Sequence, residues 1–314
     1  GYNALTANTT GSNNTAVGAG SGDAITTGSY NAAVGSEALG ATTTGASNVA
    51  VGVSALAANT TASSNTAVGR DAMIANTTGA SNVAVGYAAL DANTTANDNT
   101  AVGYNSLGAA NTGAGSTAVG KDALAANTSG QNTAVGRDAL TANTTGTENV
   151  AMGVNTLDAN TTGDYNIAIG TSALGANTTA DNNTAVGANA LLVNTTGTSN
   201  VGVGFSSLSA NTTGSENMGI GAYSLDANTT ANGNIGIGYA ALGANTTGAS
   251  NVAVGNYTLD ANTTANNNTG IGYDALGANT TGAQNVAVGT YALDASTTGN
   301  YNIAVGYGAL GANT

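Results

Sequence analysis

Residues Asn149–Tyr165 read NVAMGVNTLDANTTGDY, and this stretch holds the pattern that is repeated along the whole chain. The glycine in its fifth place recurs every 17 residues, with a single step of 16 between Gly120 and Gly136. A short repeat kept this strictly is typical of a solenoid, in which each unit forms one turn and is held by its neighbours. The pattern therefore predicts about eighteen 17-residue turns in one continuous repeat region over residues 1–314.

The first residues of each unit have the period of a β-strand. Two β-branched or apolar residues flank an Ala or Gly, as in Val83/Val85 and Ile167/Ile169, and this alternation is strand chemistry. A shorter second strand is expected at the Leu and the Ala two residues later, as in Leu90/Ala92. Gly, Asn, Thr and β-branched residues disfavour helices. Low complexity also fits disorder, but the strict register favours an all-β fold, a parallel β-solenoid or β-roll.

An asparagine opens the strand segment of almost every unit. Stacked amide side chains can hydrogen-bond from turn to turn and satisfy the backbone groups of the turns. We therefore predict a structural ladder that includes Asn48, Asn65, Asn82, Asn149, Asn166 and Asn183. The Asn of the A-N-T-T segment, as in Asn143, predicts a second ladder of the same kind.

The T-T-G turn shows a compensation between neighbouring positions. Five units have Ala in place of this Gly, and the residue that follows is then Ser63, Asn97, Asp181, Asn232 or Asn266. Gly, Asn and Asp adopt positive φ at low cost. The pattern predicts that each turn needs one residue with positive φ here, and Ser63 fits this rule least well.

The residue between the two apolar strand positions is always Ala or Gly, and it points to the opposite face of the strand. A solvated face would carry Thr, Lys or Glu, whereas a face kept to small residues indicates that another backbone approaches closely. We therefore predict a homo-oligomer contact at Ala151, Ala168, Gly202 and Gly219. The alternative is a flat coil whose small-residue face is merely unhindered.

Composition excludes several classes of function. The chain has no Cys and no His, and only three basic residues stand against 16 acidic ones, which gives a net charge of −13. It can form neither disulfides nor thiolate metal sites, and the commonest general base is missing. So acidic a chain does not suit nucleic acid. No acid recurs beside a base or nucleophile, so we expect no enzyme, cofactor or metal site, although Asp and Asn are also calcium ligands. No apolar stretch is long enough to span a membrane as a helix.

Two further patterns admit both a functional and a structural interpretation. N-x-[ST] sequons recur in the A-N-T-T segment, and glycosylation is possible at Asn93, Asn160, Asn228 and Asn262, although Asn-Thr turns also produce sequons by chance. Tyrosines recur just after the repeated glycine, as in Tyr87, Tyr104, Tyr239, Tyr273 and Tyr307. Such a row can bind sugar or protein, or brace the corner of each turn.

The strand segments resemble a known family. Asn82–Gly86 (NVAVG), Asn149–Gly153 (NVAMG) and Asn166–Gly170 (NIAIG) are similar to the head repeats of YadA-like trimeric autotransporter adhesins and to repeats in the tail fibres of bacteriophages. The resemblance covers essentially the whole chain. It implies a left-handed parallel β-roll that assembles as a homotrimer outside the cell, on a bacterial surface or a virion, and attaches to a host-cell or surface receptor or a glycan. The 17-residue unit is longer than the usual adhesin repeat, with the extra length in A-N-T-T-G.

From these features we expect an extracellular structural fibre or adhesin segment, a piece of a longer fibre protein that spaces or presents an attachment region. The alternative is a repetitive surface protein that binds ice or glycans. Ice binding needs a flat, two-column Thr array, whereas the Thr pair of this repeat, as in Thr161–Thr162, lies in a turn.

Overall fold

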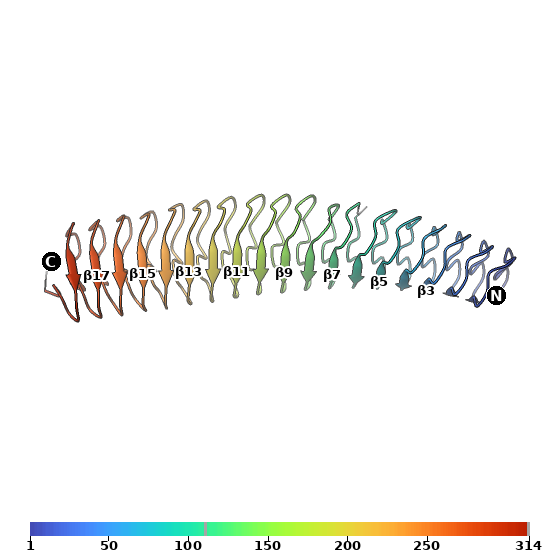
Figure 1. Ribbon diagram of the computed structural model, residues 1–314, viewed down its shortest axis with the longest axis horizontal. Coiled ribbons are helices and arrows are strands. Elements are labelled where there is room, and N and C mark those ends of the chain that lie inside the picture. Colours follow the sequence, from blue (N-terminus) through green and yellow to red (C-terminus); the bar gives the residue numbers. More distant parts are fainter. Residues whose placement is uncertain (110–111, 313–314) are drawn as a thin grey trace. The chain divides into compact units, whose positions relative to one another are not determined.

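The computed structural model describes residues 1–109 and 112–312, which form two compact units. The first unit comprises Gly1–Val154 with Asn160–Thr162, and the second comprises Asn155–Ala159 with Gly163–Thr314. In both units every turn contributes one three-residue strand, and the rest of the turn consists of tight bends (Figure 1). The described residues are all-β, with 18 strands and no helix.

The strands of each unit follow one another in chain order. The first unit contains β1 (Thr15–Val17), β2 (Ala32–Val34), β3 (Val49–Val51), β4 (Thr66–Val68), β5 (Val83–Val85), β6 (Thr100–Val102), β7 (Thr117–Val119), β8 (Thr133–Val135) and β9 (Val150–Met152). The second contains β10 (Ile167–Ile169), β11 (Thr184–Val186), β12 (Val201–Val203), β13 (Met218–Ile220), β14 (Ile235–Ile237), β15 (Val252–Val254), β16 (Thr269–Ile271), β17 (Val286–Val288) and β18 (Ile303–Val305).

Within each unit every strand pairs in parallel with the next, so that each residue lies beside its equivalent one repeat later. Ala67 pairs with Ala84 in the first unit, and Gly219 pairs with Gly236 in the second. The single 16-residue step is absorbed without loss of register, because Thr117 still pairs with Thr133. The predicted parallel β-solenoid is therefore confirmed.

The small strand residues point into the coil, and the large ones point out of it. Ala84, in the middle of β5, is fully buried, whereas Val85 is 37% exposed. The sequence interpretation assigned the small-residue face to a contact with another copy, whereas this face lies inside the coil. The physical reason is the narrow interior of a 17-residue turn. It already contains a Leu such as Leu90, an Ala such as Ala89 and the side chains of two Asn residues, so the strand can add only Ala or Gly.

The predicted second strand does not form. The Leu that was expected to carry it lies in a tight turn with positive φ, as in Leu90 (φ 55°), Leu174 (φ 52°) and Leu242 (φ 56°). This left-handed conformation is costly for Leu, and it persists because each of these side chains is fully buried. The turn also pairs with the next one, since the backbone N–H of Leu90 donates to the carbonyl of Ser106 at 2.9 Å.

The repeated glycine is required by two independent constraints. Gly238 has a φ of +134°, which L residues rarely adopt, and a Cβ built there would lie 2.5 Å from the carbonyl of Gly255 in the next turn. Gly136 has a φ of +140° and would clash in the same way with Gly153. The backbones of successive turns therefore approach too closely at this corner for any side chain.

Candidate interaction surface

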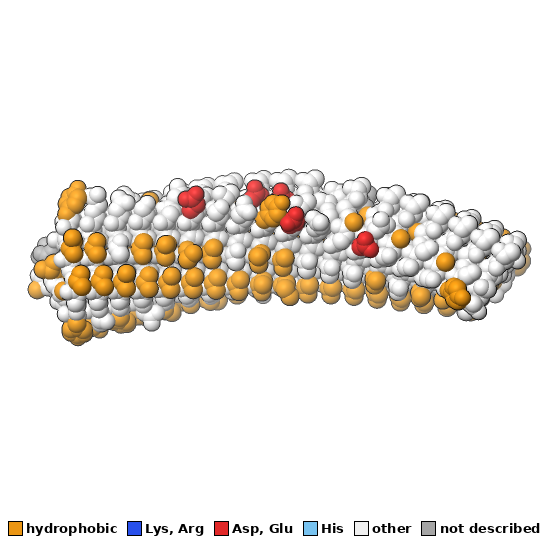
Figure 2. Space-filling model, viewed as in Figure 1, with side chains coloured by type: hydrophobic (Ala, Val, Ile, Leu, Met, Phe, Trp, Pro, Cys, Tyr) orange, Lys and Arg blue, Asp and Glu red, His pale blue; other side chains and the backbone are white. Residues whose placement is uncertain are grey.

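The most extended feature of the surface is the outer strand face, which has two rows of side chains. The first outer row consists of the first residue of each strand, and the second outer row consists of the third residue. The second outer row contains only Val, Ile and Met in all 18 described strands. The first outer row mixes Val, Ile, Met and Ala with seven Thr residues, at β1, β4, β6, β7, β8, β11 and β16. Figure 2 shows hydrophobic side chains in rows that run from turn to turn.

The residues predicted as oligomer contacts lie on the other side of these strands. Ala151 and Ala168 are fully buried inside their own coil, and Gly202 and Gly219 are buried as well. A Cβ at Gly202 would lie 3.3 Å from the Leu191 side chain of the preceding turn. The close approach indicated by the small residues is therefore internal packing, and these positions cannot contact another molecule.

The two asparagine columns form hydrogen-bonded ladders inside the coil. The backbone N–H of Asn65 donates to Oδ1 of Asn48 at 3.0 Å, and that of Asn82 donates to Oδ1 of Asn65 at 2.9 Å. In the second column, Nδ2 of Asn76 donates to Oδ1 of Asn59 at 3.2 Å. The columns also meet, because the carbonyl of Gly79 accepts from Nδ2 of both Asn65 and Asn76.

The same first column continues through the other predicted ladder residues. The backbone N–H of Asn149 donates to Oδ1 of Asn132 at 3.0 Å, and that of Asn183 donates to Oδ1 of Asn166 at 3.0 Å. These residues are fully buried. A buried amide needs partners for its donors and its acceptor. Oδ1 of Asn166 accepts from Asn183 in the next turn, and Nδ2 of Asn183 donates to Oδ1 of Asn166 and to the Gly197 carbonyl.

The four predicted glycosylation sites belong to the second column and are inaccessible. Asn93, Asn160, Asn228 and Asn262 are each fully buried. Their Nδ2 atoms, to which a sugar would be attached, donate at 2.8 Å to Oδ1 of the equivalent Asn in the preceding turn. These sequons are therefore structural in the folded chain, and the glycosylation prediction for them is corrected.

The residue that follows the Ala of each T-T-A turn accepts a hydrogen bond from the preceding turn, as Ser29, Ser215 and Asn300 also do after the Gly of T-T-G turns. Asn97 accepts through Oδ1 from the backbone N–H of Ala80 in the preceding turn at 2.7 Å, and Asn232 accepts likewise from Ser215. The equivalent oxygens of Ser63, Asp181 and Asn266 do the same. Positive φ falls instead on the residue one place later, such as Asp98 (φ 60°). The φ prediction was therefore wrong in position, and Ser63 fits the hydrogen-bond rule fully.

An aromatic row runs along the second unit, with one ring in each of seven successive turns. Adjacent ring centroids lie 5.4–6.1 Å apart and meet edge to face. The row consists of Phe205, Tyr223, Tyr239, Tyr257, Tyr273, Tyr291 and Tyr307. The sequence prediction named only Tyr239, Tyr273 and Tyr307 of this row. It missed Phe205, which also follows the repeated Gly directly, and Tyr223, Tyr257 and Tyr291, which follow one residue later. The 34-residue alternation of the two positions was the signal for these three.

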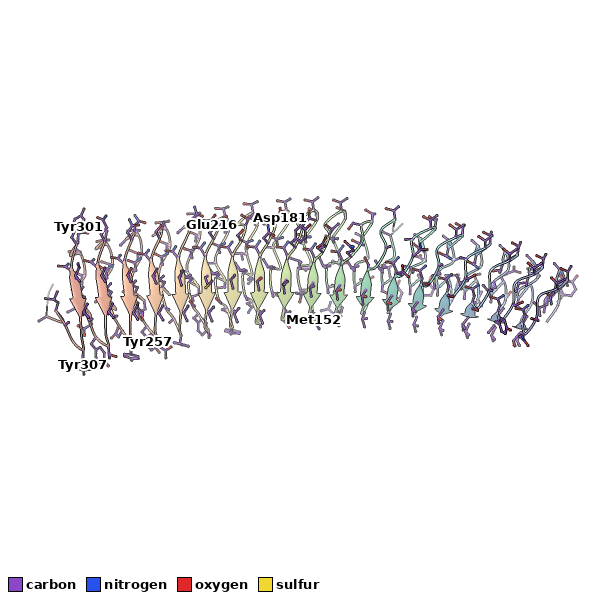
Figure 3. The ribbon with its side chains drawn as sticks, viewed as in Figure 1. Met152, Asp181, Glu216, Tyr257, Tyr301 and Tyr307 are labelled. Carbon is purple, nitrogen blue, oxygen red and sulfur yellow. The ribbon has the colours of Figure 1, made fainter. Side chains whose placement is uncertain are left out.

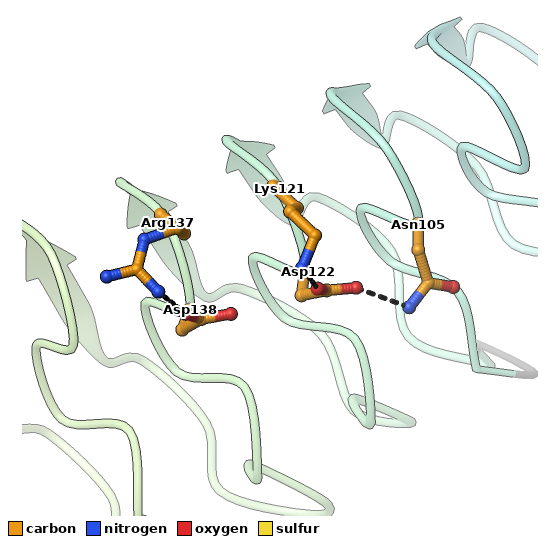
Figure 4. Close-up of polar contacts among 5 residues, drawn as sticks. All are labelled: Asn105, Lys121, Asp122, Arg137 and Asp138. Atoms are coloured by element: carbon orange, nitrogen blue, oxygen red, sulfur yellow. Dashed lines mark hydrogen bonds and ion pairs between the residues drawn. The ribbon is translucent and has the colours of Figure 1, made fainter.

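Charged side chains avoid the outer strand face. Arg70, Lys121 and Arg137 follow the repeated Gly, and each pairs with the Asp next to it, as Lys121 Nζ pairs with Asp122 at 2.7 Å (Figure 4). This ion pair and a hydrogen bond from Asn105 hold the pKa of Asp122 below its ordinary value. In the second unit, Asp181 and Glu216 lie at the edge opposite Tyr257 and Tyr307 (Figure 3).

In most T-T pairs the hydroxyl of the first Thr is engaged within the chain. It donates to a carbonyl of the next turn, as Thr77 Oγ1 donates to Thr94 O at 3.0 Å and Thr229 Oγ1 to Thr246 O at 3.1 Å. On the outer strand face, each Thr of the first outer row stands beside a Val or Ile of the second. The described strands therefore carry no two-column Thr array of the kind that ice binding needs.

Residues 1–109 and 112–312 enclose no pocket, and they bring together no group of three His, Cys, Asp or Glu side chains that could hold a metal ion. Over the same residues, no helix is long and apolar enough to cross a membrane. No protein-family model matches the chain, and a search of curated proteins finds no match to its sequence. The surface features are therefore the basis for a functional proposal.

Proposed function

We propose that the chain is a structural segment of an extracellular fibre or adhesin, in which copies associate through the outer strand face. The observation that carries the proposal is the second outer row, which is apolar in every described strand and yet exposed. Val17 is 57% exposed and Ile271 is 41% exposed. Long contiguous apolar surfaces on soluble proteins mark interaction sites.

A second copy of the chain fits this face better than an unrelated partner. Parallel strands recur about every 4.8 Å, so a partner whose side chains fill the gaps between rows needs the same spacing, and a copy has it. The distribution of charge also favours a second copy as the partner at this face. Molecules of net charge −13 repel one another, and the strands hold no charged residue. This face therefore allows copies to approach with the least repulsion.

The resemblance of segments such as Asn82–Gly86 to adhesin and tail-fibre repeats implies three further features: an assembly of three copies, a left-handed coil and a place outside the cell. The repeat itself supports a role as a spacer or presenting segment. Nearly every turn has the same strand, ladder and corner, so turns can be added without a new site being built. A host-cell receptor, surface receptor or glycan would then contact many equivalent turns and bind by avidity.

Disulfide trapping tests the proposed association, because the natural chain contains no Cys. Ile220→Cys places a thiol in the second outer row, on β13. Thr230→Cys is the matched control, since Thr230 is exposed in the T-T turn of the same repeat. Under mild oxidation at micromolar concentration we expect Ile220→Cys to give covalently linked chains and Thr230→Cys to give few. Equal linking in both variants, or none in either, would remove the support for association through this face.

A further inference from the structure

In the first unit, the contacts of two tyrosine rings that follow the repeated glycine indicate which kind of ligand group such rings bind. Tyr87 and Tyr104 stack with their centroids 5.5 Å apart and their planes 14° from parallel. Arg70 lies 5.9 Å from the Tyr87 centroid, and Lys121 lies 5.9 Å from the Tyr104 centroid. The two rings are therefore each contacted by a cation of the chain, as expected from the negative potential of an aromatic face.

The aromatic row of the second unit has seven rings and no cation. Arg70, Lys121 and Arg137 are the only basic residues of the chain, and all three belong to the first unit. The rings are accessible, since Tyr239 and Tyr273 are each 44% exposed. In an edge-to-face pair, the ring that contributes its edge has both faces turned away from that contact. Ring faces are therefore left for an outside ligand.

Carboxylates accompany the same row. Tyr223, Tyr257 and Tyr291 are each followed three residues later by an Asp, namely Asp226, Asp260 and Asp294. A Cβ atom built on Gly311 would lie 3.0 Å from Oδ1 of Asp294 and 3.7 Å from the backbone carbonyl oxygen of Tyr291, so these two oxygens are neighbours. Burial, followed by the charge of Asp274, raises the pKa of Asp260, and burial, followed by the charge of Asp294, raises that of Asp274. The turns that carry the row thus also carry carboxylates whose negative charges repel one another.

We propose that the aromatic row of the second unit binds an extended polypeptide segment rich in Lys or Arg, whose cations lie against the ring faces and beside these carboxylates. The site goes beyond the proposed self-association and names the chemistry of a different partner.

Peptide binding tests the site directly. The probe is a fluorescein-labelled (Lys-Thr)6 peptide, followed by fluorescence anisotropy at 0.15 M salt, where the Debye length is about 8 Å. We expect the triple variant Tyr239→Leu/Tyr257→Leu/Tyr273→Leu, which keeps the net charge, to weaken binding at least about tenfold, or about 1.4 kcal/mol. The triple Phe variant keeps the rings and should bind within about threefold of the natural chain.

A matched control separates the row from general electrostatic attraction. Tyr87→Leu/Tyr104→Leu removes two rings that already have cations, so binding should stay within about twofold. The proposal is overturned if the natural chain does not bind the peptide, if the triple Leu variant binds as well as the natural chain, or if cellohexaose binds the row in place of the peptide. Light scattering on the same samples reports self-association separately, so that failure of one proposal is not read as failure of the other. Thermal unfolding of the Leu and Phe variants verifies that both are folded.

Discussion

At the scale of the residue, the interior of the coil is held by polar side chains as much as by apolar ones. Most turns bury two Asn residues beside a Leu and small Ala side chains, and the amides satisfy one another from turn to turn. A buried polar group without a partner costs about 1–3 kcal/mol. The stability of the stack should therefore respond sharply where a ladder is interrupted.

Ser296 is such an interruption in the second Asn column. It replaces the Asn of the A-N-T-T segment, and Oδ1 of Asn279 has no hydrogen-bond partner among the described residues. In the intact part of the column, Nδ2 of Asn279 donates to Oδ1 of Asn262 in the preceding turn at 3.1 Å and to the Gly282 carbonyl at 2.9 Å. The amide introduced by Ser296→Asn should make the equivalent two bonds, to Oδ1 of Asn279 and to the Gly299 carbonyl, and stabilise the fold by about 1 kcal/mol, measured by thermal unfolding. Asn262→Ser, which creates the same gap, is expected to destabilise, and a lower midpoint for Ser296→Asn would contradict the ladder account.

A buried carboxylate sets a pH dependence. Burial raises the pKa of Asp226 above its ordinary value of 3.8, so the folded state holds the proton more tightly than the unfolded state does. Stability from this group is fully present below pH 3.8 and is lost as the pH rises through the raised pKa of the folded state. Asp226→Asn should therefore raise the unfolding midpoint at pH 7 and change it little at pH 3.

Asp122 provides the control of opposite sign. Its hydrogen-bonded ion pair with Lys121 lowers the pKa of this carboxyl, so the charged form is favoured in the folded state. Asp122→Asn should consequently lower the midpoint at pH 7, although only slightly because the pair is exposed. If both Asn variants shifted the midpoint at pH 7 in the same direction, net charge rather than local environment would govern the effect.

At the scale of the element, the strand and the turn beside it are matched in volume. The buried middle residue of a strand faces the residue 12 positions earlier, which precedes the buried Leu. Where that residue is Ser207 or Ser224, the strand residue is Gly219 or Gly236, and a Cβ there would lie 2.5 or 2.7 Å from the serine Oγ. Ser106 faces Ala118 instead, and its Oγ donates to Gly103 of its own turn at 3.1 Å.

A double-mutant cycle tests this matching. Ser207 Oγ donates to the Gly219 carbonyl at 2.9 Å, and Gly219→Ala should displace it at a cost of about 1 kcal/mol. In a Ser207→Ala background the same substitution should be neutral or stabilising, because Ala loses less backbone entropy on folding than Gly. Equal effects of Gly219→Ala in both backgrounds, measured by thermal unfolding, would show that the two positions are not coupled.

The 17-residue repeat length also predicts which deletions of residues the fold tolerates. Removing residues 222–255 takes out two complete turns, with β14 and β15, and joins Gly221 to Asn256 in register. This variant should fold, with its circular dichroism spectrum kept and a cooperative thermal transition. Removing residues 222–246 breaks the register and places Leu and Asn columns against unlike neighbours, so folding of that unit should fail. Equally stable products from both deletions would contradict turn-by-turn register as the basis of the fold.

Periodicity was sufficient to predict the parallel solenoid, because every residue type recurs at one spacing. It could not predict which face of the strand is internal, since alternation at positions such as Val83/Val85 defines two faces without saying which one meets the core. That choice depends on how much volume Leu90 and the Asn side chains already fill. The same limit explains the glycosylation prediction. A sequon at Asn93 is visible in the sequence, but its burial depends on the path of the turn.

At the scale of the whole molecule, charge and hydrophobicity are placed so that one face can associate. The chain has a net charge of −13, yet all 18 described strands are uncharged and present a row of Val, Ile or Met to solvent. Exposure of such a row over many turns is unfavourable for an isolated chain, since each buried CH₂ contributes about 0.8 kcal/mol. The association that we propose would remove this surface from water.

The most direct test of that claim is the mass of the natural chain in solution by sedimentation equilibrium at micromolar concentration. The account predicts a discrete homo-oligomer, with three copies expected, and dissociation to a folded single chain for Ile220→Glu/Ile237→Glu, which places two charges in the second outer row. A natural chain that sediments with the mass of one copy would contradict self-association through the outer strand face.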